Sequence, residues 1–83
     1  MDNGVLTEVK KIITTTVGKD IVPDPLEDSY PLVGNLLDSL AITNLIVALE
    51  EHYGFVFQDE ELSAEAFESP LSLADLVGDK IKT

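Results

Sequence analysis

The chain has 83 residues, of which 45% are hydrophobic, and it contains no cysteine and no tryptophan. This length predicts one small domain over residues 1–83 with a thin aliphatic core, and the lack of cysteine excludes disulfides, thiolate metal sites and cysteine nucleophiles. Sixteen acidic residues against five lysines give a formal net charge of −11, which argues against nucleic acid as a partner and favours partner proteins with basic patches.

The first predicted element is a helix that starts near Asp2 or Asn3 and ends at Gly18. Either polar residue is a suitable cap, and glycine is a common helix stop. The β-branched run over 12–17 leaves a strand as the alternative. The helix is predicted from apolar residues that recur at helical spacing: Val5, Leu6, Val9, Ile12, Ile13 and Val17.

A long loop is predicted over 19–37. Pro23, Pro25, Pro31 and Gly34 interrupt any regular element in this stretch. A loop of this length needs a packing or functional reason. We expect it to be pinned across the helix ends by its apolar residues: Ile21, Val22, Leu26, Tyr30, Leu32 and Val33.

The second helix is predicted from Ser39 to Tyr53. Asp38 or Ser39 itself is the candidate cap, and Gly54 is the stop. One apolar stripe of this helix should face the core: Ile42, Leu45, Ile46, Leu49 and Tyr53.

A neighbouring face of the same helix carries Leu40, Asn44, Val47 and Glu51 at positions i, i+4, i+7 and i+11. It mixes apolar and polar groups, as a surface that binds a partner does. The alternative is that Leu40 and Val47 only widen the core stripe.

The acidic segment 59–67 is long enough for one or two helical turns. Ser69 and Pro70 then predict the start of a last helix, with serine as the cap and proline at the first helical position. The apolar face of this helix is expected from Leu71, Leu73, Ala74, Leu76, Val77 and Ile81. The fold class is therefore all-α, a small four-helix bundle of three main helices and one short helix, with a long loop between the first two.

Ser39 is the most informative residue for function, because it opens the second helix and should point outward. A serine nucleophile needs a nearby base, and His52 is the only histidine. Thirteen residues further along one helix, His52 lies about 20 Å away. A catalytic triad is excluded, no catalytic residue is expected, and His52 is expected at the surface near the helix end. Ser39 is then either an acceptor that another enzyme modifies or a simple helix cap.

Metal binding, membrane insertion and export are not expected. The acidic residues Asp59, Glu60 and Glu61 lack the ligand spacing of a calcium loop, and the apolar run 45–49 is too short to span a membrane. The N-terminus lacks the pattern of a signal peptide. A cytoplasmic monomer is the expectation.

The order of these elements resembles that of the acyl and peptidyl carrier proteins. In that family a four-helix fold carries a 4′-phosphopantetheine arm on the serine of an Asp-Ser-Leu motif at the start of the second helix, which here is Asp38-Ser39-Leu40. The likeness extends from Val5 to Ile81 and includes Gly34, the run 45–51, Tyr53-Gly54-Phe55, Asp59-Glu60-Glu61-Leu62 and Ala66-Phe67-Glu68-Ser69 before the apolar stretch 71–77.

This resemblance implies a carrier and not an enzyme. A phosphopantetheinyl transferase would attach the arm from coenzyme A to Ser39, and acyl or aminoacyl groups would then be held on the arm as thioesters. The implied partners are that transferase, a loading ligase or acyltransferase, and downstream synthases with basic docking patches. The expected docking residues are Asp38, Leu40, Asn44, Val47, Glu50 and Glu51. The resemblance also implies a shallow cleft between the second and third helices that shelters a short acyl chain.

The chain departs from the carriers of fatty acid synthesis at two positions. Those carriers have acidic residues where this chain has Ala41 and Asn44. The departure favours a stand-alone carrier of a specialised polyketide, aminoacyl or modified fatty acid pathway. The alternatives are a housekeeping carrier of fatty acid synthesis and, from a different class, an acidic interaction module in which Ser39 is only a cap.

Overall fold

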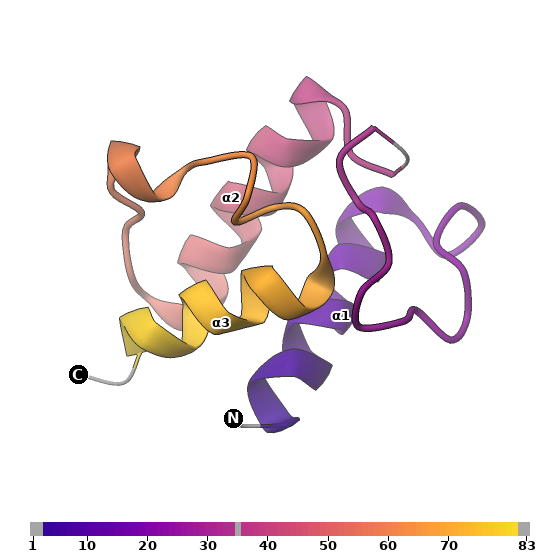
Figure 1. Cartoon of the computed structure of the whole chain (residues 1–83), viewed down its shortest axis with the longest axis horizontal. Coiled ribbons are helices and arrows are strands. Elements are labelled where there is room, and N and C mark those ends of the chain that lie inside the picture. The colour runs from indigo at the N-terminus through magenta and orange to yellow at the C-terminus, as the bar shows by residue number, and fades with distance from the viewer. Residues whose placement is uncertain (1–2, 35, 82–83) are drawn as a thin grey trace.

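The computed structural model describes residues 3–34 and 36–81. It contains three α-helices, α1 (Asn3–Val17), α2 (Ser39–Tyr53) and α3 (Pro70–Ile81), and one 3₁₀ turn, η1 (Asp59–Glu61). In the described part of the chain, the only β-type pairing is an isolated parallel bridge between Val33 and Leu37. The predicted all-α class and the three main helices are confirmed (Figure 1). None of the described helices is long and apolar enough to cross a membrane.

Helix α1 forms despite the β-branched residues of its second half, so the strand alternative is wrong. Val5, Val9 and Ile13 are buried at helical spacing, and burial of this stripe outweighs the small propensity penalty of β-branched side chains. The helix ends where Gly18, at a φ of 121°, donates its N–H to the carbonyl of Thr14 at 2.9 Å. The candidate cap Asp2 lies outside the described residues.

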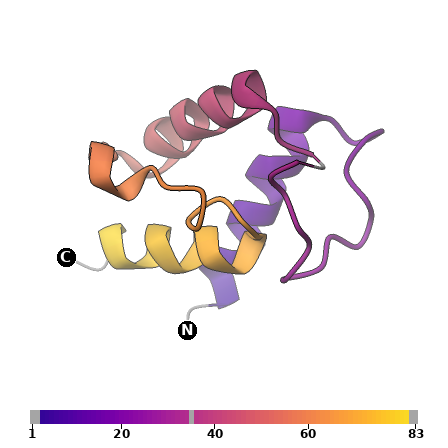
Figure 2. The same cartoon turned by 45° about the horizontal axis from the view of Figure 1, so that its top comes forward.

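The core lies where α1 packs against both α2 and α3 (Figures 1 and 2). In α2, Leu45 and Leu49 are completely buried, while Ile42, Ile46 and Tyr53 pack partly buried against them, as the predicted stripe requires. The remaining buried apolar side chains come from α1, the loops and α3: Val5, Val9, Ile13, Val22, Leu26, Leu32, Leu37, Phe57, Phe67, Leu73, Ala74 and Val77.

The segment between α1 and α2 has no helix among its described residues, and it lies at the end of the molecule opposite η1 (Figure 1). Two backbone hydrogen bonds attach this segment to the start of α3. Leu32 N–H donates to the Glu68 carbonyl at 2.8 Å, and Leu71 N–H donates to the Asp28 carbonyl at 2.9 Å. Its buried anchors are Val22, Leu26 and Leu32, as predicted, and Tyr30 is partly buried against the core.

The prediction that Ile21 and Val33 anchor this loop in the core is wrong. Ile21 is 61% exposed and Val33 is 42% exposed. Ile21 lies in the turn that follows Gly18, to whose carbonyl it donates at 3.1 Å, and this turn faces away from the core. Val33 precedes Gly34, which has a φ of 88°, so the chain reverses there and leaves Val33 outside.

The connection from α2 to α3 contains one short helical turn, at the lower end of the predicted one or two. Within 59–67 only the single 3₁₀ turn η1 forms, because this acidic stretch lacks a buried stripe that would support a longer helix. Ser69 and Pro70 begin α3 as predicted: Ser69 Oγ accepts from Ser72 N–H at 3.2 Å. The expected apolar face of α3 stops short of its end, because Ile81 is 40% exposed in the last turn.

Candidate functional site

The start of α2 is capped by Asp38 and not by Ser39. Asp38 is extended (φ −97°, ψ −177°), and its Oδ1 accepts the backbone N–H of Ala41 at 2.8 Å. Its carbonyl accepts from Ile42 N–H at 2.9 Å, which closes the first helical turn. The loop before it is folded tightly, since the N–H groups of Leu36 and Leu37 both donate to the Leu32 carbonyl at 2.9 Å. Together these bonds fix where the helix begins.

Ser39 is therefore the first residue of α2, and it is exposed. Its hydroxyl has no hydrogen-bond partner among residues 3–34 and 36–81, while its carbonyl accepts from Thr43 Oγ1 at 3.0 Å. The interpretation of Ser39 as only a helix cap is not supported, because the Asp38 carboxylate caps α2.

Other serines contrast with Ser39 in how their hydroxyls are used. Ser63 Oγ accepts from Ala66 N–H at 3.3 Å, and Ser72 Oγ donates to the Ala66 carbonyl at 3.1 Å. Ser69 Oγ is bonded to Ser72 as the cap of α3. Ser29 is exposed, but it lies in a turn of the long loop and not at a helix start. Ser39 alone among these five combines an exposed position with the start of a helix, where backbone N–H groups favour a phosphate.

His52 lies at the far end of α2 and cannot serve Ser39 as a base. Its Nε2 is 3.1 Å from Oε1 of Glu8 on α1, and its side chain is 45% exposed. The expected surface position is confirmed. Among the described residues, no three His, Asp or Glu side chains are grouped so that they could hold a metal ion.

The face of α2 next to Ser39 is open to solvent. Leu40 is 70% exposed and Val47 is 47% exposed, and Asn44 and Glu51 are also exposed. The alternative in which Leu40 and Val47 widen the core is wrong. This exposed stripe begins at Leu40, directly after Ser39, and runs along α2.

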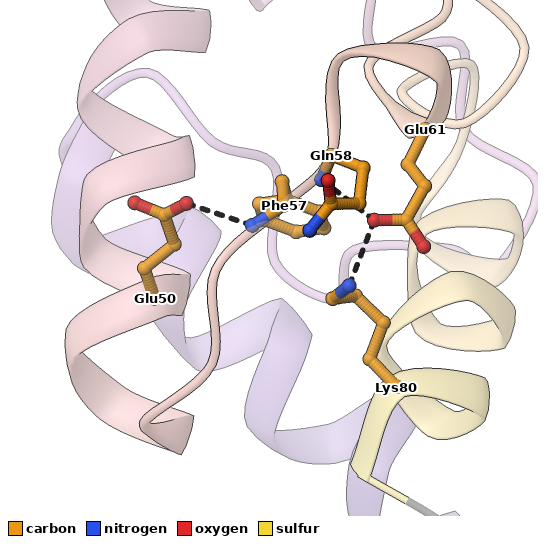
Figure 3. A network of polar contacts seen from close by, with 5 residues as sticks. All are labelled: Glu50, Phe57, Gln58, Glu61 and Lys80. Atoms are coloured by element: carbon orange, nitrogen blue, oxygen red, sulfur yellow. Dashed lines mark hydrogen bonds and ion pairs between the residues drawn. The ribbon is translucent and has the colours of Figure 1, made fainter.

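Glu50 differs from the other expected docking residues. It is half-buried, and its Oε2 accepts the backbone N–H of Phe57 at 2.9 Å (Figure 3). That carboxylate is therefore hydrogen-bonded to the loop that follows α2, and its role in docking stays a prediction.

Sequence reasoning missed the polar network that continues from this bond. Glu61 Oε1 accepts from Gln58 N–H at 2.8 Å and from Lys80 Nζ at 2.7 Å (Figure 3). The backbone bond from Gln58, followed by the bond from Lys80, lowers the pKa of Glu61. Lys80 Nζ also lies 5.5 Å from the centre of the Phe55 ring. The network joins α2 to α3 through the loop between them.

Two surface cavities lie away from Ser39. One of about 640 Å³ lies between α1 and the loop residues 19–26, and one of about 490 Å³ lies between α1 and α2 near His52. Neither lies between α2 and α3, where the resemblance places a cleft for a short acyl chain. That cleft stays an expectation.

Comparison with known proteins identifies the kind of site. A family model described as phosphopantetheine attachment site matches residues 7–77. The chain is also similar to the solution structure of a holo acyl carrier protein from Nitrosomonas europaea, with 38% sequence identity and a TM-score of 0.83, over 94% of this chain and 96% of that one. No match is found among curated proteins.

Proposed function

Because this chain belongs to the phosphopantetheine-binding carrier proteins, which hold acyl groups on a covalent 4′-phosphopantetheine, we propose that Ser39 is its attachment residue. The observation that supports this assignment is the exposed hydroxyl of Ser39 at the first position of α2, beside a carboxylate that already caps the helix. The fold presents the hydroxyl without engaging it.

The residues around Ser39 fit a phosphodiester. In the transfer, the Ser39 oxygen forms a bond to the phosphorus that bears the pantetheine arm of coenzyme A, the bond from that phosphorus to the second phosphate breaks, and the serine proton passes to a base of the transferase. The dipole at the start of α2 favours the charge of the new phosphodiester, whereas the neighbouring Asp38 carboxylate, which already accepts the Ala41 N–H, opposes it. When bound, the arm supplies a thiol that holds an acyl or aminoacyl group as a thioester.

The contribution of this chain is presentation and not catalysis. Asp38 fixes the start of α2. The loop before it is fixed by the two hydrogen bonds that the Leu32 carbonyl accepts from Leu36 and Leu37. We propose that the face of Leu40, Asn44, Val47 and Glu51 is the docking surface for the transferase and then for the enzymes that load and consume the cargo.

We further propose that the cargo belongs to a specialised pathway and not to housekeeping fatty acid synthesis. The support comes from the sequence of α2. Between Ser39 and Leu49 the helix has no acidic residue, and Ala41 and Asn44 stand at positions where the carriers of fatty acid synthesis usually have acids. An enzyme that recognises a carrier by acids close to the attachment serine has little to bind here.

The test of the attachment residue is incubation of the apo protein with coenzyme A, Mg²⁺ and a broad-specificity phosphopantetheinyl transferase, followed by intact mass measurement. We expect the wild type to gain one phosphopantetheine and Ser39→Ala to gain none. Ser29→Ala, which removes an exposed serine that is not at a helix start, should be modified like the wild type. Addition to Ser39→Ala at the wild-type rate would refute the assignment.

A further inference from the structure

Three of the five lysines of the chain line one cavity. Lys10, Lys11 and Lys19 all lie on the wall of the cavity of about 640 Å³ between α1 and the loop 19–26, and the chain has no arginine. Lys80, in α3, is bonded instead to the carboxylate that ends η1. The described part of the chain therefore gathers its positive charge at this cavity, although the formal net charge of the whole chain is −11.

The three ammonium groups differ in how firmly they are held. Lys10 is bonded to Asp28, and its side chain is 27% exposed. Lys11 lies with its Nζ 3.9 Å from Glu8, a separation at which an exposed ion pair stabilises little. Lys19 is exposed and has no hydrogen-bond or ion-pair partner in the part of the chain that the structure describes. Lys11 and Lys19 are thus available to a ligand.

The loop side of the cavity is largely apolar. Val22 and Leu26 hold it to the core, at 6% and 7% exposure, and Pro23 and Pro25 restrict the backbone between them. Sites for small molecules combine a concave apolar wall of this size with a few charged or polar groups. This cavity has both parts, since the loop supplies the apolar wall and the lysines supply the charge.

The balance of charge at the cavity limits the ligand to a weak anion. The wall also includes one acid, Asp24, which is exposed and opposes a negative ligand. Three lysines outnumber this acid, but the pairing of Lys10 with Asp28 and of Lys11 with Glu8 offsets part of their charge. Acids further away are screened beyond about 8 Å at physiological salt. The excess suits one negative charge and not a polyanion.

We propose that the cavity between α1 and the loop 19–26 binds a small organic carboxylate with an apolar body. The carboxylate pairs with Lys11 and Lys19, and the apolar body lies against the loop between Val22 and Leu26. The inference does not rest on the proposed function, because this site does not include Ser39.

The experiment follows the backbone amide shifts of the full apo chain by NMR during titration with 2-naphthoate, a small aromatic carboxylate. The amides of Thr15, Lys19, Val22 and Leu26 should shift together and saturate with a Kd of about 1 mM, as expected for a molecule of this size. The alcohol 2-naphthylmethanol has the same rings without the charge, and inorganic phosphate has charge without the rings. Each should bind at least about threefold more weakly, because each lacks one of the two contacts.

Charge variants identify the groups that hold the carboxylate. Lys19→Gln should raise the Kd of 2-naphthoate by about threefold, and Lys11→Gln combined with Lys19→Gln by about tenfold, since each removes one exposed charge. Asp24→Asn removes the acid of the wall and should lower the Kd by about twofold. Glu65→Gln is the matched control: it changes the net charge equally, but Glu65 is an exposed residue before α3 and is not on this wall, so the Kd should equal that of the wild type.

Four results would overturn the proposal: no saturable shift, shifts confined to amides outside the cavity, a Kd unchanged when Lys11 and Lys19 are both replaced, or 2-naphthylmethanol that binds as tightly as 2-naphthoate. The amide spectra of the variants also show whether the fold is intact, which is expected because the replaced side chains are at the surface. Failure here is distinct from failure of the proposed function, because the titration does not involve phosphopantetheine transfer.

Discussion

Lys80 Nζ lies 2.7 Å from Oε1 of Glu61, and the same oxygen accepts the backbone N–H of Gln58 at 2.8 Å (Figure 3). Glu61 ends η1, and Lys80 lies in the last turn of α3. One carboxylate therefore both closes the 3₁₀ turn and fastens it to the last helix. Because Glu50 holds Phe57 N–H from the side of α2, two consecutive backbone amides are held by carboxylates from different elements.

This arrangement predicts a pH dependence of stability. The bonds from Gln58 and Lys80 lower the pKa of Glu61 below its ordinary value of 4.5. An acid whose pKa is lower in the folded state stabilises the fold above its unfolded pKa, and this contribution is lost as the pH falls through the folded pKa. We expect Glu61→Gln to lower the urea midpoint at pH 7, and the difference from the wild type to shrink as the pH is lowered to about 3.

The matched control for this prediction is Glu60→Gln, which removes the neighbouring exposed acid. In a chain with a formal net charge of −11, removal of an acid that has no partner among the described residues relieves repulsion, so the urea midpoint of Glu60→Gln at pH 7 should stay the same or rise. A fall of equal size for both variants would show that the bonds of Glu61 do not stabilise the fold.

Lys80 should contribute more to stability than an ordinary surface lysine. Its side chain is only 14% exposed, and its Nζ lies 5.5 Å and 5.9 Å from the ring centres of Phe55 and Phe57. Lys80→Met keeps most of the aliphatic stem and removes the charge, and it should lower the free energy of unfolding by about 1 kcal/mol. Lys11→Met, at a lysine that is 73% exposed and 3.9 Å from Glu8, should change it by less than about 0.5 kcal/mol. If Lys80→Met and Lys11→Met lowered the free energy of unfolding equally in denaturant titrations, the larger stabilising role of Lys80 would be contradicted.

Local sequence signals were sufficient for the helices and for the position of Ser39 at the start of α2. The bounds of α2 follow from Asp38, a capping residue in extended conformation, and from Gly54, which adopts a φ of 77° and ends the helix. Because capping and helical periodicity act over a few residues, they can be identified in the sequence alone. The same local rule placed Ser39 at the helix start.

The features that were missed depend on contacts between distant residues. The bond from Lys80 to Glu61 joins positions 19 apart in the sequence, and nothing local to either residue indicates it. The bond from the Phe57 N–H to Glu50 was also missed, because it joins α2 to a loop that helical periodicity does not describe. The exposure of Ile21 and Val33 likewise depends on how the long loop turns, because the apolar character of a side chain does not by itself place it in the core.

Glu50 should stabilise the connection between α2 and α3. Glu50→Ala leaves the part-buried N–H of Phe57 without its acceptor, which should lower the free energy of unfolding by about 1 to 3 kcal/mol. Glu50→Gln retains an acceptor oxygen and should lose less. Hydrogen exchange at the Phe57 amide should be faster in the alanine variant, whereas Glu51→Ala, at the exposed neighbour, should leave it unchanged. Unaltered exchange in Glu50→Ala would show that this bond does not hold the loop.

Asp38 and Ser39 should separate cleanly into a structural residue and a functional one. Asp38→Ala removes the acceptor of the Ala41 N–H and should lower the free energy of unfolding by about 1 kcal/mol, and Asp38→Asn should retain most of the stability as another good cap. Ser39→Ala should change stability by less than about 0.5 kcal/mol, since the hydroxyl has no partner among the described residues. Chemical denaturation of the apo proteins measures the first property, and intact mass after the transferase reaction measures the second. If Ser39→Ala were as destabilising as Asp38→Ala, the serine would be part of the cap, and its freedom to accept the phosphopantetheine arm would be contradicted.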